Sequence, residues 1–247
     1  MLGRLFAKLL RPLVSGKGAL VSDAAQPRTA DPLAEYFFSN PGRLIHKWHH
    51  YFEIYHRHFN AFRGRSPVVV EIGVSHGGSL QMWRHYFGPG AQIVGIDVDP
   101  RCKQFEDEST AILIGDQADR RFLAEIRERV PRIDILIDDG GHTMTQQIAT
   151  FEELYPHIQP NGLYLCEDLH TSFVAEYGGG YRREGTFLEY SKALVDRLYG
   201  WYSKDPGLAV DNMTRTTFAL HFYDSVLVIE KRPMEPPQVS RTGNPSF

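Results

Sequence analysis

Carboxylates and histidines concentrate in two short stretches of this sequence. Residues 138–142 are Asp-Asp-Gly-Gly-His, and Glu167 is followed by Asp168. Carboxylates that lie together without a counter-charge repel one another, and a hard divalent cation such as Mg²⁺ removes the repulsion through oxygen ligands. An imidazole beside them can accept a proton near neutral pH. The two stretches therefore indicate a metal-assisted proton-transfer site, with His142 as the base and His170 as the alternative base.

A glycine-rich segment suits a ligand that contains a nucleoside. The pattern E-x-G-x-x-x-G-G begins at Glu71, and its glycines Gly73 and Gly77 let the backbone turn tightly next to a ligand. A dinucleotide-binding fingerprint has glycine where this chain has Val74. The segment therefore favours a nucleoside-like ligand over a dinucleotide, and an ordinary glycine turn is the alternative.

Side chains at two later positions support the same interpretation. Asp97 can accept hydrogen bonds from both hydroxyls of a ribose. Asp116 and Gln117 can reach the exocyclic amine and ring nitrogens of an adenine. The structural alternatives are a helix cap for Asp97 and a turn for the pair.

Most of these residues follow short apolar runs that we predict to be strands. Strands that alternate with helices indicate a parallel sheet with helices on both faces, and ligands of such sheets bind at the carboxyl ends of the strands. The last two runs predict an antiparallel hairpin at one edge. The predicted strands are 67–74, 91–98, 111–114, 133–137, 162–166, 218–223 and 225–230, and the predicted helices are 79–87, 119–130 and 145–157.

Composition excludes several classes of protein. The 247 residues are 42% hydrophobic and 23% charged, as in globular domains and unlike disordered or fibrous chains. The formal net charge is −3, so the chain lacks the basic surplus typical of nucleic-acid-binding proteins, and we expect no nucleic-acid partner. Two cysteines exclude a disulfide scaffold, and no apolar run has the length of a membrane span.

We divide the chain into three parts. Residues 1–33 are a basic amphipathic arm and linker. We expect its first 17 residues to pack on their own domain or on another subunit, with weak contact to a membrane surface as the alternative. Residues 34–231 are the catalytic domain, with a helical, histidine-rich extension over 34–66 for packing or substrate contact. Residues 232–247 are an irregular Pro-rich tail.

Five segments give the sequence its family resemblance. It resembles the class I S-adenosylmethionine-dependent methyltransferases, and within them the metal-dependent macrolide-sugar O-methyltransferases of the mycinamicin type. The match covers about 45–230, and only about 65 residues precede the first core strand, as expected for the catalytic domain alone. The segments are EIGVSHGGSLQMW (71–83), GIDVDP (95–100), GDQAD (115–119), IDDGGHTMTQQ (137–147) and EDLHTS (167–172).

The resemblance implies a fold, cofactors and site residues. The fold is α/β and Rossmann-like, with a mostly parallel seven-stranded sheet, an antiparallel edge hairpin and helices on both faces. S-adenosyl-L-methionine and Mg²⁺, or another divalent cation, are the implied cofactors. Asp139, Glu167 and Asp168 are the implied metal ligands, and His142 is the implied base. The implied cofactor-binding residues are Glu71, Gly73, Gly77, Asp97, Asp116 and Gln117.

The resemblance also implies a reaction. A methyl group is transferred to a sugar hydroxyl or another vicinal hydroxyl of a small-molecule glycoside or glycolipid. The enzyme is expected to be a cytoplasmic homo-oligomer. It would be peripheral to the membrane if the arm binds lipid. One alternative is a non-heme iron oxygenase, which the glycine loop and Asp97 oppose. The other is a non-catalytic methyltransferase-fold binding protein, which has no need of the acids and His142.

Overall fold

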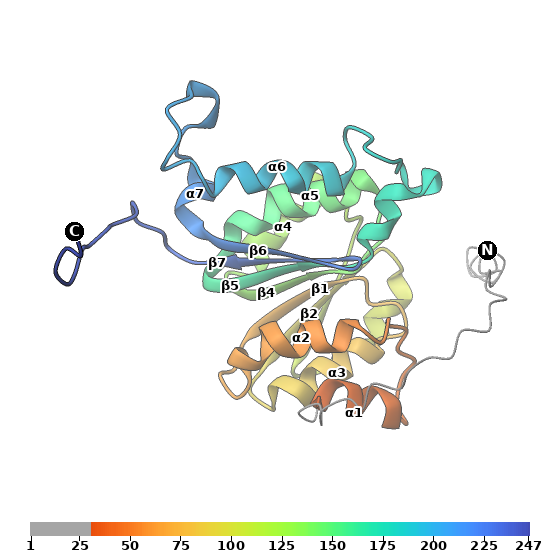
Figure 1. Cartoon of the computed structure of the whole chain (residues 1–247). Coiled ribbons are helices and arrows are strands. Elements are labelled where there is room, and N and C mark those ends of the chain that lie inside the picture. Colours follow the sequence, from red (N-terminus) through yellow and green to blue (C-terminus); the bar gives the residue numbers. More distant parts are fainter. Residues whose placement is uncertain (1–30) are drawn as a thin grey trace, which may run out of the picture. The chain divides into compact units, whose positions relative to one another are not determined.

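A single mixed sheet organises the computed structural model, which describes residues 31–247 (Figure 1). The strand order is β3-β2-β1-β4-β5-β7-β6. The first five strands pair in parallel, and β7 pairs antiparallel with both β5 and β6. The expected fold and edge hairpin are confirmed. The strands are β1 (Val68–Ile72), β2 (Gln92–Asp97), β3 (Thr110–Ile114), β4 (Ile133–Asp138), β5 (Ile158–Cys166), β6 (Thr217–Tyr223) and β7 (Val226–Lys231).

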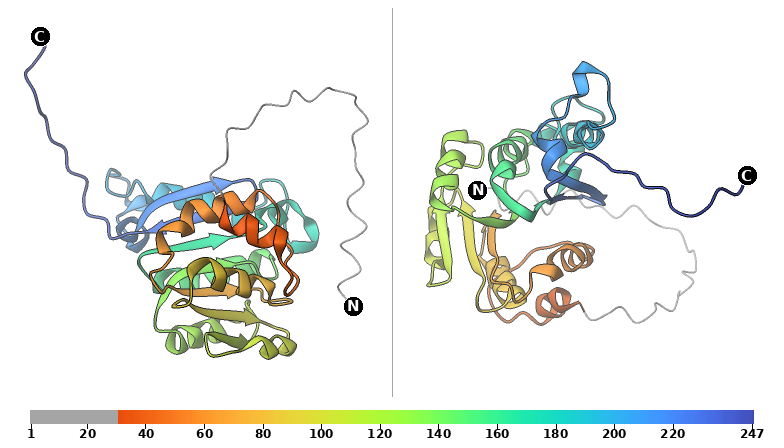
Figure 2. Two further views of the ribbon diagram at one scale, coloured as in Figure 1. Left: turned by 90° about the horizontal axis from the view of Figure 1, so that it is seen from below. Right: turned by 90° about the vertical axis from the view of Figure 1, so that its left-hand side faces the viewer.

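Helices cover both faces of the sheet (Figure 1 and Figure 2). One face carries α1, α2 and α3, and the other carries α4, α5 and α6. Because successive strand residues point to opposite faces, Val69 packs with the first group while Val70 and Ile72 pack with the second. The helices are α1 (Pro32–Ser39), α2 (Tyr51–Phe59), α3 (Gly78–Phe87), α4 (Arg120–Arg129), α5 (Met144–Leu154), α6 (Phe187–Arg197) and α7 (Asn212–Thr216).

Side-chain caps begin helices α4 and α5, which follow the carboxyl ends of β3 and β4. Asp119 accepts a hydrogen bond from the Arg121 N–H at the start of α4. Thr143 and Gln146 form a capping box at the start of α5. The caps fix where each helix begins, and therefore how long the loop between strand and helix is. These two loops carry Asp116, Gln117, Asp139 and His142.

The structure departs from the sequence expectations in the N-terminal extension and in two helices that were not predicted. The extension over 34–66 is two helices separated by a non-helical stretch that contains Pro41 and Gly42, which favour turns. Helices α6 and α7 lie where no element was predicted. The arm at 1–17 lies outside the described residues, and 232–247 contain no helix or strand. In the part that is described, every helix is too short or too polar to cross a membrane.

Candidate active site

A cavity of about 430 Å³ opens at the carboxyl ends of the parallel strands. It lies where β2 and β4 flank β1 on opposite sides, which is the place where the strand order reverses. Ligands of open α/β sheets bind at such reversal points. Five of the residues predicted from the sequence line the cavity: Gly73, Asp97, Asp116, Gln117 and Asp139.

Gly73 brings the loop after β1 against the loop after β4. Its φ is +99°, and a Cβ atom placed there would lie 1.9 Å from the Asp139 carbonyl oxygen. Only glycine meets both conditions. Gly77 also has a positive φ, but it does not line the cavity. A Cβ there would meet the Phe105 ring at 2.7 Å, so this glycine serves the start of α3.

Asp97 is held at the cavity wall by backbone amides. Its Oδ2 accepts hydrogen bonds from the N–H groups of Val74 and Ser75, both at 2.9 Å, and its Oδ1 accepts one from Asp99 N–H at 2.9 Å. The carboxylate therefore fixes the loop after β1. Asp116 accepts a hydrogen bond from Ala118 N–H at 2.8 Å, and its side chain is exposed at the cavity.

Gln117 lines the cavity, but protein groups occupy its amide. Its Nε2 donates to Asp138 and, at 3.0 Å, to Thr150 Oγ1. Its Oε1 accepts from Gly141 N–H at 3.1 Å. The amide clamps the loop after β4, and its predicted contact with an adenine stays a prediction. Burial raises the pKa of Asp138 to about 7, so this acid belongs to the buried frame beneath the cavity.

Glu71 was predicted to contact the cofactor, but in the structure its side chain contacts α3 instead. Its side chain points to α3, where the carboxylate accepts hydrogen bonds from Ser79 Oγ at 2.7 Å and Trp83 Nε1 at 2.9 Å. It is fully buried and does not line the cavity. Burial raises its pKa to about 7. The structure therefore does not bring Glu71 together with the other predicted residues.

Beside the cavity, Asp139, His142 and Asp168 converge. One ligand atom from each lies within 4.8 Å of the others. The Nε2 atom of His142 is 3.7 Å from Asp139 Oδ1 and 3.5 Å from Asp168 Oδ2. Both His142 and Asp168 have a positive φ, which is uncommon for residues other than glycine. Two carboxylates and an imidazole in this arrangement could hold a divalent cation.

Glu167 is placed differently from the other two predicted ligands. It is 1% exposed, and both its oxygens accept hydrogen bonds from Lys47 Nζ, at 2.8 and 2.9 Å. The Tyr55 hydroxyl donates to it at 2.7 Å. Lys47 also donates to Asp139. Burial lowers the pKa of the Lys47 ammonium, but Asp139 and Glu167 outweigh burial and hold the pKa above its ordinary value.

The N-terminal extension supplies residues that the sequence analysis did not identify. Besides Lys47 and Tyr55, the Tyr51 hydroxyl donates to Asp168 Oδ1 at 2.7 Å. A signal was present, because tyrosines four residues apart lie on one side of a helix. His170 lies at the margin: its Nδ1 is 3.9 Å from Asp168 and bonds to Ser225 Oγ at 2.7 Å. His142 therefore has the better position for a base.

Comparisons with known proteins find similarity to methyltransferases. A family model described as a methyltransferase domain matches residues 70–169. The chain is 36% identical over 197 residues to the 8-demethyl-8-alpha-L-rhamnosyl tetracenomycin-C 2'-O-methyltransferase of Streptomyces olivaceus, covering 75% of this chain and 52% of that protein. It is 34% identical over 218 residues to the mycinamicin VI 2''-O-methyltransferase of Micromonospora griseorubida, covering 83% and 53%.

A solved structure matches the fold. The MycE methyltransferase from the mycinamycin biosynthetic pathway, in complex with Mg and SAH, has a TM-score of 0.73 and 33% identity. The match covers 83% of this chain and 55% of that one. The chain thus spans about half the length of the curated relatives it matches.

Proposed function

Because the chain carries a class I methyltransferase domain, we propose that it is an S-adenosylmethionine-dependent O-methyltransferase acting on a sugar hydroxyl of a small-molecule glycoside. One observation carries the proposal: the cavity with Gly73 and Asp97 lies beside the group Asp139, His142 and Asp168. A cofactor cavity and a possible acid–base and metal centre thus share one edge of the sheet. The relatives named above act on rhamnosyl and mycinamicin glycosides, which supports a glycoside acceptor; a glycolipid is the alternative.

The cavity wall would hold the cofactor through its acids. S-adenosylmethionine supplies a methyl group that is already activated on sulfonium. Asp97 is positioned by three backbone amides to accept hydrogen bonds from ribose hydroxyls. Asp116 would accept one from the adenine amine. Gly73 keeps the loop after β1 close to Asp139, so this loop runs beside the acids.

The acids fit a divalent cation, and a solved relative was determined with Mg. Asp139 and Asp168 offer carboxylate oxygens, which Mg²⁺ prefers. Glu167 would join them as the third ligand by exchanging one of its hydrogen bonds from Lys47. When bound, the cation lowers the pKa of the acceptor hydroxyl and orients it. Lys47 and Tyr51 hold the carboxylates in place.

His142 would remove the proton from the acceptor. Its Nε2 faces the acids, and its Nδ1 is buried without a hydrogen-bond partner. Asp139 and Asp168 lie close enough to stabilise the imidazolium that forms. The residue therefore combines a free ring nitrogen with acids that would stabilise its charged form.

Calorimetry and product analysis test the proposal. Wild-type protein should bind S-adenosylhomocysteine, and Asp97→Ala should bind it at least about tenfold more weakly, since a hydrogen bond to a charged group contributes roughly 1.5–3 kcal/mol. With Mg²⁺ and a panel of glycosides, mass spectrometry should detect a methylated product. His142→Gln should abolish most turnover while S-adenosylhomocysteine still binds. No binding by the wild type would refute the methyltransferase assignment.

The same assay separates the proposal from the iron oxygenase alternative. Such oxygenases use two histidines and one carboxylate, whereas this group holds one histidine and two carboxylates. Turnover should continue with Mg²⁺ under anaerobic conditions. Turnover that requires iron and oxygen would favour the alternative.

Assembly and location belong to the same proposal. We infer a cytoplasmic homo-oligomer, and light scattering coupled to size-exclusion chromatography tests the assembly. A monomer at assay concentrations would contradict it. Co-sedimentation with anionic vesicles tests whether the chain contacts a membrane surface, and no sedimentation would contradict that contact.

A further inference from the structure

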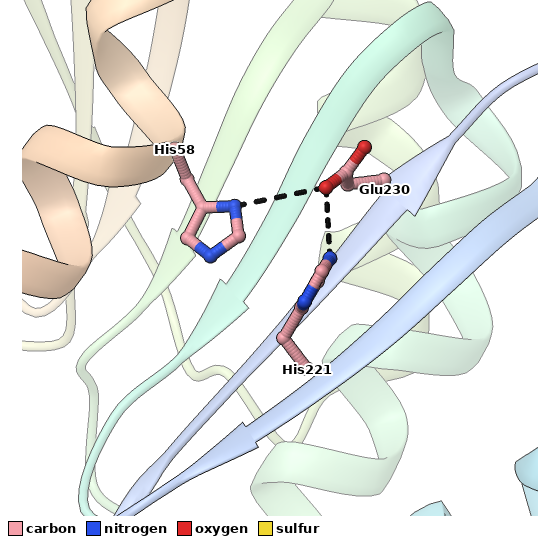
Figure 3. A group of neighbouring side chains, drawn as sticks. All are labelled: His58, His221 and Glu230. Atoms are coloured by element: carbon pink, nitrogen blue, oxygen red, sulfur yellow. Dashed lines mark hydrogen bonds and ion pairs between the residues drawn. The ribbon is translucent and has the colours of Figure 1, made fainter.

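Two histidines and a glutamate meet away from the candidate active site (Figure 3). His58 comes from the end of α2, His221 from β6 and Glu230 from β7. One ligand atom from each lies within 4.8 Å of the others. His58 and Glu230 also line a cavity of about 460 Å³ next to Pro67 and Asp134, which lie where β1 and β4 begin. The group is therefore at the opposite end of the parallel strands from the acids described above.

The distances within this group are near those between ligands of one metal ion. Glu230 Oε1 is 2.8 Å from His221 Nε2 and 3.9 Å from His58 Nδ1. Ligand atoms bound tetrahedrally to zinc at 2.0–2.1 Å lie about 3.3 Å apart. The two observed distances lie on either side of that value. Shifts of about half an ångström would bring both atoms to it, which side-chain rotation alone can supply.

Tyr223 orients the buried imidazole of His58. The Tyr223 hydroxyl lies 2.9 Å from His58 Nε2, and the His58 side chain is 5% exposed. The other nitrogen, Nδ1, faces Glu230 at 3.9 Å, which is too far for a hydrogen bond. A hydrogen-bonded outer nitrogen that fixes the ring is the usual arrangement of a histidine that binds metal through its inner nitrogen.

We propose that His58, His221 and Glu230 form a second metal site that binds a divalent transition metal such as Zn²⁺. Imidazole nitrogens favour zinc and its neighbours in the first transition row over Mg²⁺. The adjoining cavity leaves room for a water molecule as the fourth ligand. The bound ion would join α2 to the edge hairpin β6–β7.

The other interpretation is an ion pair across the hairpin with a buried histidine beside it. In that case the three residues contribute packing and hydrogen bonds only, and zinc has no effect beyond adventitious binding. The two interpretations differ in one measurable property, the number of zinc ions that the folded chain retains.

Native mass spectrometry and equilibrium dialysis of the full chain with micromolar Zn²⁺ count those ions. Asp168→Asn provides the background, because it removes an acid from the Asp139, His142 and Asp168 group. This background should retain one zinc ion. Adding His221→Gln should weaken that binding at least about 100-fold, as expected when a ligand is removed. Tyr223→Phe should weaken it about tenfold to 100-fold, because the hydroxyl only orients His58.

Matched controls keep the outcome clear. His85→Gln removes an exposed histidine elsewhere and should leave zinc retention unchanged. Zinc should also raise the thermal midpoint of the background but not that of the His221→Gln double variant. Equal retention with and without His221, or no retained zinc at all, would overturn the proposal. Because no arm measures methyl transfer, the proposed enzyme activity can fail without affecting this result.

Discussion

Lys47 places a positive charge among the acids of the candidate active site. Its side chain is 3% exposed and donates to both Asp139 and Glu167. A buried charge is costly unless it is paired. The ammonium therefore already offsets part of the carboxylate repulsion, and the charge left for a cation to neutralise is centred on Asp168 and the second oxygen of Asp139.

Lys47→Met should lower the free energy of unfolding by about 3–5 kcal/mol in EDTA, because it leaves the buried Glu167 and the partly buried Asp139 without their counter-charge. Adding Mg²⁺ should stabilise this variant more than the wild type. Chemical denaturation with and without Mg²⁺ measures both effects. The control is Lys192→Met, which removes an exposed ion pair with Glu189 and should cost less than about 1 kcal/mol. Equal costs for the two variants would show that Lys47 has no special electrostatic role.

Glu71 should make stability depend on pH. Its folded-state pKa of about 7 lies above its ordinary value of 4.5, so folding favours the protonated form. The stability it contributes is fully present below pH 4.5 and is lost as the pH rises through 7. Glu71→Gln removes this loss. The unfolding free energy of the variant, relative to wild type, should therefore rise by up to about 3 kcal/mol between pH 4.5 and 8.

Denaturation of both proteins at pH 5 and at pH 8 tests this expectation. Gln keeps one acceptor oxygen for Ser79 or Trp83, so the shape of the site is preserved. A constant difference between the two proteins across this range would contradict the elevated pKa.

At the scale of elements, the loop after β1 passes so close to the loop after β4 that few residue types fit at the point of contact. Gly73 needs a positive φ and also lacks room for a Cβ atom. Gly64 has a positive φ of +70°, but nothing lies within 4 Å of its Cβ position. Substitutions at these two glycines can therefore distinguish the cost of backbone strain from the cost of a steric clash.

Gly64→Ala should cost about 1–2 kcal/mol, the price of a left-handed conformation alone. Gly73→Ala should cost clearly more, roughly 3–5 kcal/mol, since the new methyl group displaces the loop that carries Asp139. It should also weaken S-adenosylhomocysteine binding, which Gly64→Ala should not. Denaturation and calorimetry measure these differences. Equal effects of the two substitutions would mean that the close approach is unimportant.

The sequence predicted the strands well because their pattern is local. Buried parallel strands are continuous apolar runs, and all seven appear within a few residues of their predicted bounds. Helix α6 was missed although Thr186, with Glu189 three residues later, is a helix-start signal, and Thr186 does cap the helix. The sequence therefore contained a signal for the start of α6 that our prediction did not use.

The partners of the site acids could not be predicted in this way. Tyr51 on α2 and Lys47 in the stretch before α2 reach Asp168 and Glu167 only because this segment packs on the sheet, and no spacing in the sequence records that contact. Strand alternation turns Glu71 toward α3, and the glycine pattern around it says nothing about that, so its contact with a cofactor stays a prediction. Local patterns predicted which edge holds the site, and tertiary packing decided which side chains complete it.

At the scale of the molecule, α2 links parts of the chain that are remote in sequence. Tyr51 and Tyr55 contact the acids at the carboxyl ends of the strands, and His58 contacts the edge hairpin. About 10 Å of helix separates Tyr51 from His58, at 1.5 Å per residue. One short helix therefore contributes to both groups of candidate ligands.

This placement of α2 has a consequence for the order of events during synthesis. Lys47 and Glu167 are 120 residues apart, and His58 and Tyr223 are 165 apart. At about 5–20 residues per second, the ribosome takes roughly 6–24 s to make the first interval. Until then Lys47 can pair only with Asp139, which is 92 residues away, and α2 has no finished sheet to cover. During synthesis the aromatic side chains of α2 therefore lack the surface that later buries them, which makes this segment a natural client for chaperones.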